Sequence, residues 1–314
     1  MGNSTVETAS TYSRLLVKSA IKDVAERAYK EEHERFNARK ELYSEEPLDQ
    51  AYAEYYSVNT IGNIPKFNGK LEALTGSPGF LSRFEPVEYA AKRQWERKFL
   101  QFKQFGVMND ESSQLGISAA RTINTACAVP FVYGTSAALE YQTYNEEGVA
   151  LISGSHTTKA GVSTTTGFSN TATLAFSPTN LATIRLQGAN LKSPIGTRMG
   201  TNFDTILHPL ALQQQVSEVM STQNGLYSGE GTKNFWATQG YKAICWNMLD
   251  DYDTNDWYLI DSTQMKKDLK FLSAVEPEFK SNLDFETFLT SISVYFMFGL
   301  AYKGYRWIIK CTVG

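Results

Sequence analysis

Residues 108–142 read MNDESSQLGISAARTINTACAVPFVYGTSAALEYQ, and this stretch decides the predicted fold. Small or apolar side chains recur close to the 3.6-residue period of a helix with one buried face. Asn109 or Asp110 can cap its start, and Pro130 removes a backbone donor, so we expect a kink there. The stretch predicts a long central helix whose buried face carries Leu115, Ala119, Ile123, Ala126, Tyr133 and Ala137.

An N-terminal segment also has a helical pattern, over residues 12–43. From Lys30 onward its charges alternate in sign, and pairs four residues apart, such as Glu31 and Arg35, support an isolated helix. Two interpretations remain open: a helix with a solvated face, or an arm that lies along a neighbouring subunit. The predicted apolar stripe of this helix carries Leu16, Ala20, Val24 and Ala28.

The segment between the two helices, residues 49–105, has an extended character and is poorly able to fold alone. Glycine and proline punctuate it from Gly62 to Gly79, which indicates turns. Its last part, residues 83–105, fits both a helix and a strand, so periodicity leaves the two open. The pattern predicts either a two-armed projecting loop with its tip near residues 68–80 or an ordinary surface hairpin.

The chain from residue 149 onward is typical of a compact α/β lobe with additional long strands. Ser177-Pro178 starts a helix, because serine caps the first turn and proline needs no backbone donor there. His208-Pro209 opens another helix, which Asn224-Gly225 closes. Residues 153–180 are rich in Ser, Thr and Gly, which predicts an exposed, mobile loop. The predicted strands cover residues 149–152, 203–207, 241–248, 257–260, 269–275, 292–298 and 305–309.

The composition limits the possible functions. The 314 residues carry 30 Lys+Arg against 33 Asp+Glu, a net charge of −3, whereas a dedicated nucleic-acid binder needs a concentrated basic face. Aromatic residues make up 13% of the chain, which suits large protein–protein interfaces. Cys127, Cys245 and Cys311 fit no disulfide or zinc pattern and are predicted to be buried free thiols. No secretory signal or apolar run of membrane-spanning length is present, so we expect a soluble, intracellular protein.

No motif predicts an active site, and we expect no catalytic residue, no cofactor and no metal ion. Residues 134–138 loosely resemble a nucleophile elbow, but that motif needs a strand–turn–helix setting, whereas these residues are predicted to lie inside or just after a helix. Asp250, Asp251, Asp253 and Asp256 lack the order of a calcium loop, so a solvated acidic turn is the better interpretation. The three histidines, at structural or solvated positions, are His33, His156 and His208.

Several segments of the second half resemble one known family in their order and spacing. They are LAFSPTNL at residues 174–181, a turn at Gly196, DTILHPLAL at 204–212, WYLI at 257–260 and GYRW at 304–307. The series resembles the major head (capsid) subunits of tailed bacteriophages, and its pattern is closest to the Mu-like prophage type. In that type the segment that corresponds to residues 204–212 reads roughly Asp-x-Leu-Ile-x-Pro-Pro-x-Leu, and this chain has His208-Pro209 in place of the doubled proline. The resemblance covers roughly residues 50–314.

The resemblance implies an α+β fold of the Hong Kong 97 type. Such a fold has an N-terminal arm, an extended E-loop, a P-domain with a long spine helix, and an α/β A-domain. It would resolve the loop-or-hairpin alternative towards an E-loop, and we expect no large scaffolding segment before the arm. The implied division is 1–48 for the arm, 49–105 for the E-loop region, 106–148 for the P-domain with its spine helix, 149–264 for the A-domain, and 265–314 for C-terminal strands that complete the P-domain and return to the A-domain.

The resemblance also implies a function. The chain would be a major capsid protein that self-assembles, as hexamers and pentamers, into an icosahedral phage head around double-stranded DNA. Its near-neutral charge fits a wall that touches DNA only weakly and non-specifically. Scaffolding, portal and cement proteins are the further implied partners, and the implied location is the virion, after assembly in the host cytoplasm. The alternatives are the shell of an encapsulin-like cellular nanocompartment and a hydrolase with Ser136 as nucleophile.

The E-loop interpretation names candidate contacts between subunits. Some relatives cross-link an E-loop lysine to an asparagine of a neighbour, and Lys66 and Lys70 lie in the corresponding region, although ordinary surface lysines are the simpler interpretation. A two-stranded arm has little core of its own, so its apolar groups should be buried by an adjacent subunit. The candidates are Tyr55, Tyr56, Ile64, Lys66, Phe67, Lys70, Leu71, Leu74 and Phe80.

Overall fold

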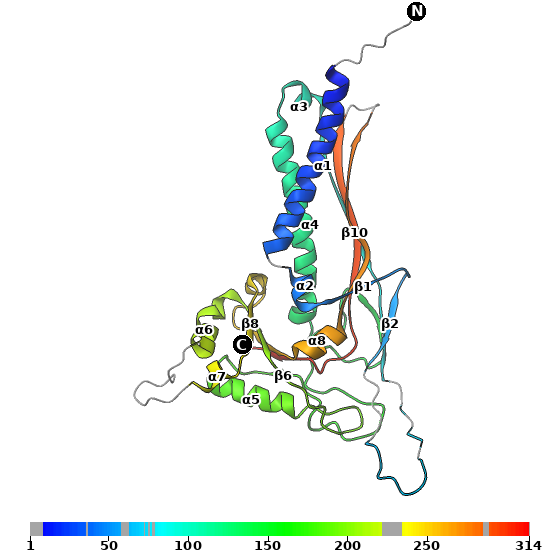
Figure 1. Ribbon diagram of the computed structural model, residues 1–314, viewed down its shortest axis with the longest axis vertical. Helices are drawn as coiled ribbons and strands as arrows, with labels where there is room; N and C mark the ends of the chain where they lie inside the picture. The colour runs from blue at the N-terminus through cyan, green and yellow to red at the C-terminus, as the bar shows by residue number, and fades with distance from the viewer. Residues whose placement is uncertain are drawn as a thin grey trace, which may run out of the picture.

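The computed structural model describes residues 9–35, 37–57, 63–71, 73–74, 76, 79–221, 234–284 and 289–313, with side chains from Ala20 onward. Figure 1 shows a tall layer, in which two long helices stand beside long strands, above a broader lobe that holds most of the shorter elements. A loop extends from the lower end, away from both parts. Helices and sheets are thus combined in the way that the predicted α+β class requires.

Two helices, α1 (Ala9–Arg35) and α4 (Phe105–Val132), pack side by side along the tall layer (Figure 1). They approach closely because small residues meet: a Cβ added to Gly116 of α4 would lie 2.2 Å from the carbonyl oxygen of the buried Ala25 of α1. Arg121 of α4 also pairs with Glu32 of α1 at 3.5 Å. The helix that was predicted either as solvated or as an arm therefore packs one face on its own chain.

The buried face of α1 carries Ile21, Ala25 and Ala28. The predicted stripe was therefore partly wrong, because Ala20 is exposed and Ile21 takes the buried position. The charged end of this segment also differs from the predicted continuous helix. Helix α1 ends at Arg35, and the short helix α2 (Ala38–Leu42) begins after Asn37, whose side chain caps its first turn by accepting from the Lys40 amide.

The central helix α4 differs from the prediction at both ends. It begins at Phe105, so Asn109 and Asp110 lie inside it instead of capping it. It ends at Val132, because the chain turns tightly at Gly134, where a Cβ would lie 2.3 Å from the Pro130 carbonyl oxygen. The predicted burial is confirmed for Leu115, Ala119, Ile123 and Ala126, whereas Tyr133 and Ala137 follow the helix and are exposed.

A four-stranded sheet lies beside the two helices (Figure 1). Its order is β1-β10-β11-β4, with β1 parallel to β10 and the other pairs antiparallel. The alternating pattern predicted for residues 292–298, in β11, is confirmed, since Ile292, Val294 and Phe296 are buried and the residues between them are less buried. The strands are β1 (Ser44–Pro47), β4 (Val87–Trp95), β10 (Leu269–Leu283) and β11 (Thr290–Tyr302).

The second half of the predicted projecting loop belongs to this sheet. Strand β4 pairs with β11 along its whole length, from Val87 opposite Phe298 to Trp95 opposite Thr290. The helix α3 (Arg97–Gln101) follows, so the two interpretations left open for residues 83–105 each describe part of the segment. Inclusion of this strand in a two-armed projecting loop was wrong, because the hydrogen bonds of its backbone go to a distant strand that local patterns do not reveal.

The loop that does project is shorter and rises from a second, three-stranded sheet. Its order is β2-β3-β5, formed by β2 (Ala53–Tyr56), β3 (Leu81–Phe84) and β5 (Gln142–Asn145). Residues 57–80, called the projecting loop below, connect the first two strands, and the described part of this loop extends beyond the body (Figure 1). The buried Phe84 joins this sheet to the core by packing on Tyr302, with ring centroids 5.1 Å apart.

The lobe is built on a five-stranded sheet of order β6-β12-β9-β7-β8. The helix predicted at Ser177-Pro178 is confirmed: Ser177 accepts from the Asn180 amide, and Leu181 and Ile184 are buried. The strands are β6 (Thr171–Ala172), β7 (Thr205–His208), β8 (Lys242–Cys245), β9 (Trp257–Ile260) and β12 (Ile308–Cys311). The helices are α5 (Pro178–Ala189), η1 (Leu210–Leu212), α6 (Gln213–Ser221), α7 (Phe235–Thr238), η2 (Asn247–Asp251) and α8 (Ser262–Asp268).

Two details of the lobe differ from the predictions, and a third is not tested. Residues 149–152 form no strand, although Leu151 and Ile152 are buried. Residues 305–307 precede the last strand, which begins at Ile308. The predicted helix end at Asn224-Gly225 lies outside the described residues.

The Ser/Thr-rich segment 153–176 is not a simple exposed loop. Phe168 is buried, and the His156 ring stacks on Tyr305 with a centroid separation of 3.4 Å. Asn170 is also buried: its side chain accepts from the Ser153 amide and donates to the Leu151 carbonyl. The predicted exposed loop is therefore fastened to its own chain at several points, and its mobility remains a prediction.

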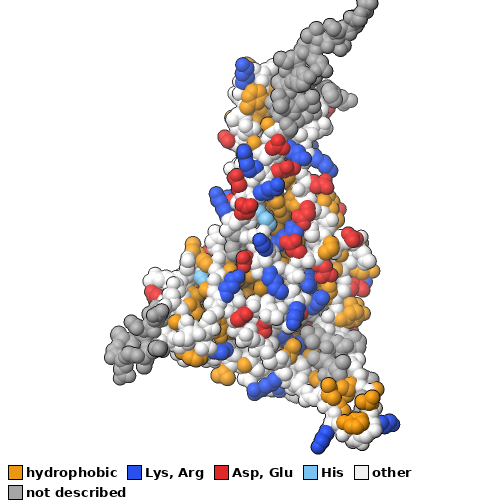
Figure 2. All heavy atoms as spheres, viewed as in Figure 1, with side chains coloured by type: hydrophobic (Ala, Val, Ile, Leu, Met, Phe, Trp, Pro, Cys, Tyr) orange, Lys and Arg blue, Asp and Glu red, His pale blue; other side chains and the backbone are white. Residues whose placement is uncertain are grey.

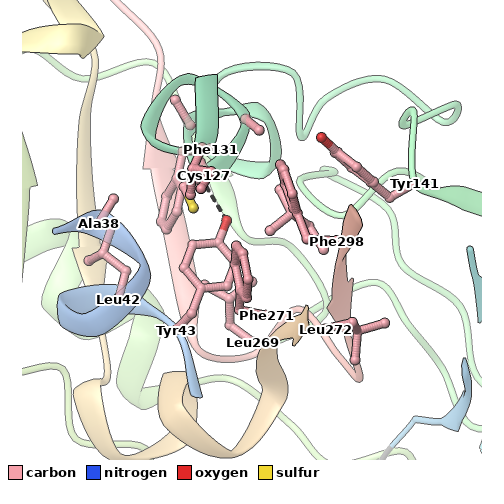
Figure 3. Close-up of a cluster of buried hydrophobic side chains, with 14 of the residues drawn as sticks. Ala38, Leu42, Tyr43, Cys127, Phe131, Tyr141, Leu269, Phe271, Leu272 and Phe298 are labelled. Atoms are coloured by element: carbon pink, nitrogen blue, oxygen red, sulfur yellow. Dashed lines mark hydrogen bonds between the residues drawn. The ribbon is translucent and has the colours of Figure 1, made fainter. Parts of the chain in front are cut away.

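The main core lies where the tall layer meets the lobe. Phe131, near the end of α4, has edge-on contacts with Trp246, Tyr258 and Trp307 at centroid distances of 5.8 to 6.2 Å. Figure 3 shows Tyr43, the residue after α2, pointing at the same helix, and its hydroxyl donates to the Cys127 carbonyl oxygen at 2.7 Å. The three cysteines are free, as predicted, although Cys245 is only half-buried. None of the helices in the described residues combines the length and the hydropathy needed to span a bilayer.

Candidate assembly surfaces

The base of the projecting loop is held by a small antiparallel ladder between β2 and β3. Arg83 lies opposite Glu54, and its Nε and Nη2 donate to the Glu54 Oε1 at 3.0 and 2.7 Å. The Arg83 guanidinium also lies 4.3 Å from the centroid of the Tyr52 ring. Cross-strand pairs of this kind stabilise register, so the loop rises from an ordered platform.

The tip of the projecting loop carries apolar side chains that its own chain does not cover. Ile64 is 88% exposed, Phe67 69% and Leu71 87%, and Leu74 is exposed as well. These four residues are called the tip side chains below. Figure 2 shows hydrophobic side chains gathered at this end of the molecule. Because monomeric soluble proteins rarely expose contiguous apolar patches, such a patch indicates an interaction site.

The structure divides the predicted contact residues into two groups. Tyr55 and Phe80 lie at the base and are half-buried in their own chain, where Tyr55 packs on Phe84 with centroids 6.3 Å apart. The prediction that the loop has little core of its own therefore fits the tip but not the base. The second group is exposed and free to be covered by another molecule; it comprises Tyr56, Lys66, Lys70 and the tip side chains.

A buried cation fastens the N-terminal segment to the four-stranded sheet. Arg39 of α2 is 7% exposed and donates to Glu276 of β10 at 2.6 and 2.9 Å and to Glu45 of β1 at 3.0 Å. Its guanidinium also lies 4.4 Å from the centroid of Phe271. The hydrogen bonds from Arg39 hold the pKa of Glu276 below its usual value. Sequence reasoning missed this site, because Arg39 lies in a run of alternating charges that is typical of a solvated helix.

The acidic residues near η2 are occupied by their own chain, so the predicted solvated turn was partly wrong. Asp256 is buried and pairs with Lys310 at 3.0 Å. Asp250 accepts from the amides of Leu210 and Ala211 at 2.7 and 2.9 Å and so caps the turn that follows β7. Across the part of the chain that the structure describes, no group of three His, Cys, Asp or Glu residues is arranged to hold a metal ion.

The loose nucleophile-elbow pattern lacks the geometry of a hydrolase. Ser136 lies in the turn after α4, and its hydroxyl contacts the backbone of Ala138. His156 faces Glu147 and Asn170, and His208 faces the Pro209 carbonyl oxygen. Burial lowers the pKa of His208, which favours its neutral form. The third histidine, His33, stacks on Tyr29. The contacts of all three histidines are therefore structural.

Further apolar side chains that the sequence did not single out are exposed away from the projecting loop. Phe102 and Val107 lie where α3 meets α4 at the far end of the tall layer, and Leu186 and Phe235 lie on α5 and α7 of the lobe. The molecule thus offers apolar surface at widely separated points. A subunit with several neighbours would need such a distribution.

Comparison with known proteins agrees with this architecture. The model of the family described as phage capsid protein matches residues 82–311. No curated protein matches the chain. The segments that carry the resemblance to phage head subunits, between residues 174 and 307, lie within the matched range. The Mu-like type within that resemblance remains a prediction.

Solved structures share the fold at low sequence identity. The capsid of a native GTA particle has a TM-score of 0.55 and 9% identity, over 88% of this chain and 90% of that one. The capsid of Myoviridae phage XM1 has a TM-score of 0.52 and 11% identity, over 88% and 90%. A virus-like particle from Pyrococcus furiosus has a TM-score of 0.51 and 10% identity, over 94% and 97%. The fold is therefore of the Hong Kong 97 type, and the chain belongs to the phage capsid protein family as a shell-forming major capsid protein.

Proposed function

We propose that copies of this subunit assemble, as hexamers and pentamers, into an icosahedral phage head that encloses double-stranded DNA. The observation that carries the proposal is the projecting loop, whose ordered base presents four uncovered apolar side chains at its tip. Their burial against a neighbouring subunit, together with Tyr56, Lys66 and Lys70, would supply a contact repeated over the whole shell. Obligate interfaces of this kind are large and mostly apolar.

The domains follow from this proposal. Residues 1–48 are the N-terminal arm, 49–105 the E-loop region, 106–148 the P-domain with α4 as its spine helix, 149–264 the A-domain, and 265–314 the C-terminal strands. One refinement is needed, because β4 pairs with β11 and belongs to the P-domain sheet. The chain has no catalytic role here, and its net charge of −3 suits weak, non-specific contact with DNA. Scaffolding, portal and cement proteins are further partners, and assembly takes place in the host cytoplasm.

The direct test is to image the purified protein by negative-stain electron microscopy and to measure its sedimentation. We expect closed shells or capsomers of uniform size. A uniform monomer, even after co-expression with the genes that neighbour its own, would contradict the proposal.

The alternative with the same fold is the shell of an encapsulin-like nanocompartment. The family match is to phage capsid proteins, so this alternative is not favoured. Terminase, portal and tail genes beside this gene are expected for a phage head, whereas a cargo-enzyme gene would indicate a nanocompartment. Replacement of Ser136 with alanine should leave assembly unchanged, because its hydroxyl contacts only local backbone.

A further inference from the structure

The two ends of the projecting loop meet at a tight crossing. The Ser57 amide donates to the Phe80 carbonyl oxygen at 2.8 Å, and the Phe80 amide donates to the Ser57 hydroxyl at 2.8 Å. Gly79 is required for this approach, because a Cβ there would lie 2.2 Å from the Ser57 Oγ. The loop therefore leaves the body at one defined point, and its direction depends on what holds that point.

A lysine from the lobe reaches this point. The Nζ of Lys159 donates to the Gly79 carbonyl oxygen at 3.2 Å and lies 5.2 Å from the centroid of the Phe80 ring. The same atom pairs with the Glu146 carboxylate at 2.5 Å. Lys159 thus joins the Ser/Thr-rich segment of the lobe to the last residues of the projecting loop.

The carboxylate of Glu146 links Lys159 to the start of β3, the strand that follows the projecting loop. Glu146 follows β5, and its Oε2 accepts from the Leu81 amide at 2.7 Å, where β3 begins. Its own amide donates to the Leu81 carbonyl oxygen at 2.9 Å. Hydrogen bonds from Lys159 and from the Leu81 amide hold the pKa of the Glu146 carboxyl below its usual value, so it stays ionised at neutral pH.

The segment that presents Lys159 is itself fixed to the lobe. The Thr158 hydroxyl donates to the Pro194 carbonyl oxygen at 2.7 Å, and the Thr157 amide donates to Glu147 at 2.8 Å. The buried His156 is stacked on Tyr305 just before these two residues. Lys159 therefore acts from a fixed support, although the side chains of Lys159 and Glu146 are each 34% exposed. Exposed ion pairs contribute little to folding, so the geometry is better suited to positioning.

We propose that Lys159 and Glu146 form a clasp that sets the direction of the projecting loop, and so positions its tip side chains for docking on a neighbouring subunit. This inference rests on the proposed function, since it assigns the pair a part in assembly. Preorganisation of a docking element lowers the conformational entropy lost on binding. Loss of the clasp should then weaken assembly while the subunit stays folded.

The loop direction is measured in the unassembled full-length subunit by pulsed EPR. Spin labels are placed at Asn68→Cys on the loop and Leu186→Cys on α5, with Cys245→Ser to remove the accessible thiol. We expect Lys159→Met to broaden the distance distribution about twofold or more, because the loop loses its lateral support. Lys159→Arg retains the charge and the donors, and it should restore the wild-type width. Equal widths for the wild type and Lys159→Met would overturn the proposal.

Assembly is measured in parallel, as the protein concentration at which shells appear in sedimentation. We expect Lys159→Met to raise it about tenfold, whereas Lys280→Met is the matched control, since it removes an exposed pair with Glu278 far from the loop. An equal rise in both variants would overturn the clasp. If circular dichroism shows that Lys159→Met unfolds, Glu146→Gln replaces it in both assays. A wild-type protein that forms no shells would refute the proposed function, while the EPR widths would still judge the clasp.

Discussion

The packing of α1 on α4 leads to a sharp prediction about two glycines of the same helix. Alanine normally stabilises a helix interior by up to about 1 kcal/mol relative to glycine. At Gly116 the added Cβ would lie 2.2 Å from the Ala25 carbonyl oxygen, more than 1 Å short of ordinary van der Waals contact, which begins near 3.4 Å. At Gly106 nothing lies within 4 Å of the added atom. The neighbour at Gly116 is backbone, so it cannot rotate away.

We therefore expect opposite outcomes for the two substitutions. Gly116→Ala should force the helices apart and lower the free energy of unfolding by about 1–3 kcal/mol, the usual cost of overpacking. Gly106 lies in the first turn of α4, where the preference for alanine is weaker than in the interior, so Gly106→Ala should be neutral or stabilising by less than about 1 kcal/mol. Both are measured on the unassembled subunit by urea denaturation, followed by circular dichroism.

A Gly116→Ala subunit as stable as the Gly106→Ala subunit would refute the close packing of α1 on α4. In that case the N-terminal helix would have to lie elsewhere, for example along another copy of the chain. The result would then support the open interpretation in which this segment lies along a neighbouring subunit.

Three further predictions concern the loop and the buried cation. The variant Ile64→Ser/Leu71→Ser should keep the wild-type unfolding midpoint, because both side chains are exposed. It should raise the protein concentration at which shells appear in sedimentation at least a hundredfold, since burial of each side chain contributes about 1.5–3 kcal/mol. Ile64→Val/Leu71→Met is its control, and unchanged assembly of the serine variant would contradict the docking role. Deletion of residues 68–79 should leave the melting curve of the tall layer and the lobe intact and abolish shells, whereas outright unfolding would assign the loop to the subunit's own core. Arg39 lowers the pKa of Glu276 from its ordinary 4.5, so the ion pair stabilises the fold above about pH 4.5, and this stabilisation is lost as the pH falls through the lower folded pKa. The urea midpoint should therefore drop more between pH 6 and about pH 3.5 for the wild type than for Glu276→Gln. Equal drops would argue against the pair.

The features that the sequence predicted well are those that local chemistry decides. Ser177 and Pro178 begin α5 because capping and a fixed backbone angle act within one turn. The alternating burial of β11 follows from the two-residue period of any strand with one buried face. In the same way, the glycines and prolines between Gly62 and Gly79 predicted a loop with little core of its own, whose apolar tip is exposed in the structure.

The features that were missed depend on pairing between distant segments. Strand β4 joins β11 across about two hundred residues, and nothing in its own pattern separates it from a loop arm. Arg39 finds Glu276 across a similar separation, so its burial is hidden in a run of surface-like charges. Helix α4 ends earlier than predicted because the chain turns tightly at Gly134, close to the Pro130 carbonyl oxygen. The apolar periodicity continues through this turn and so does not reveal it.

The exposed edge of the four-stranded sheet has a consequence for errors in assembly. Among the strands of the described residues, β4 is the last of its sheet, so one row of its backbone donors and acceptors has no partner strand there. Such an edge can recruit the same strand of another copy and propagate open fibres. The exposed stretch of β4 carries Lys92 and Arg93, which would face like charges in a parallel in-register pairing and in antiparallel pairings centred on these residues. A chain made in many copies at high local concentration is thereby steered away from fibres and kept available for closed assemblies.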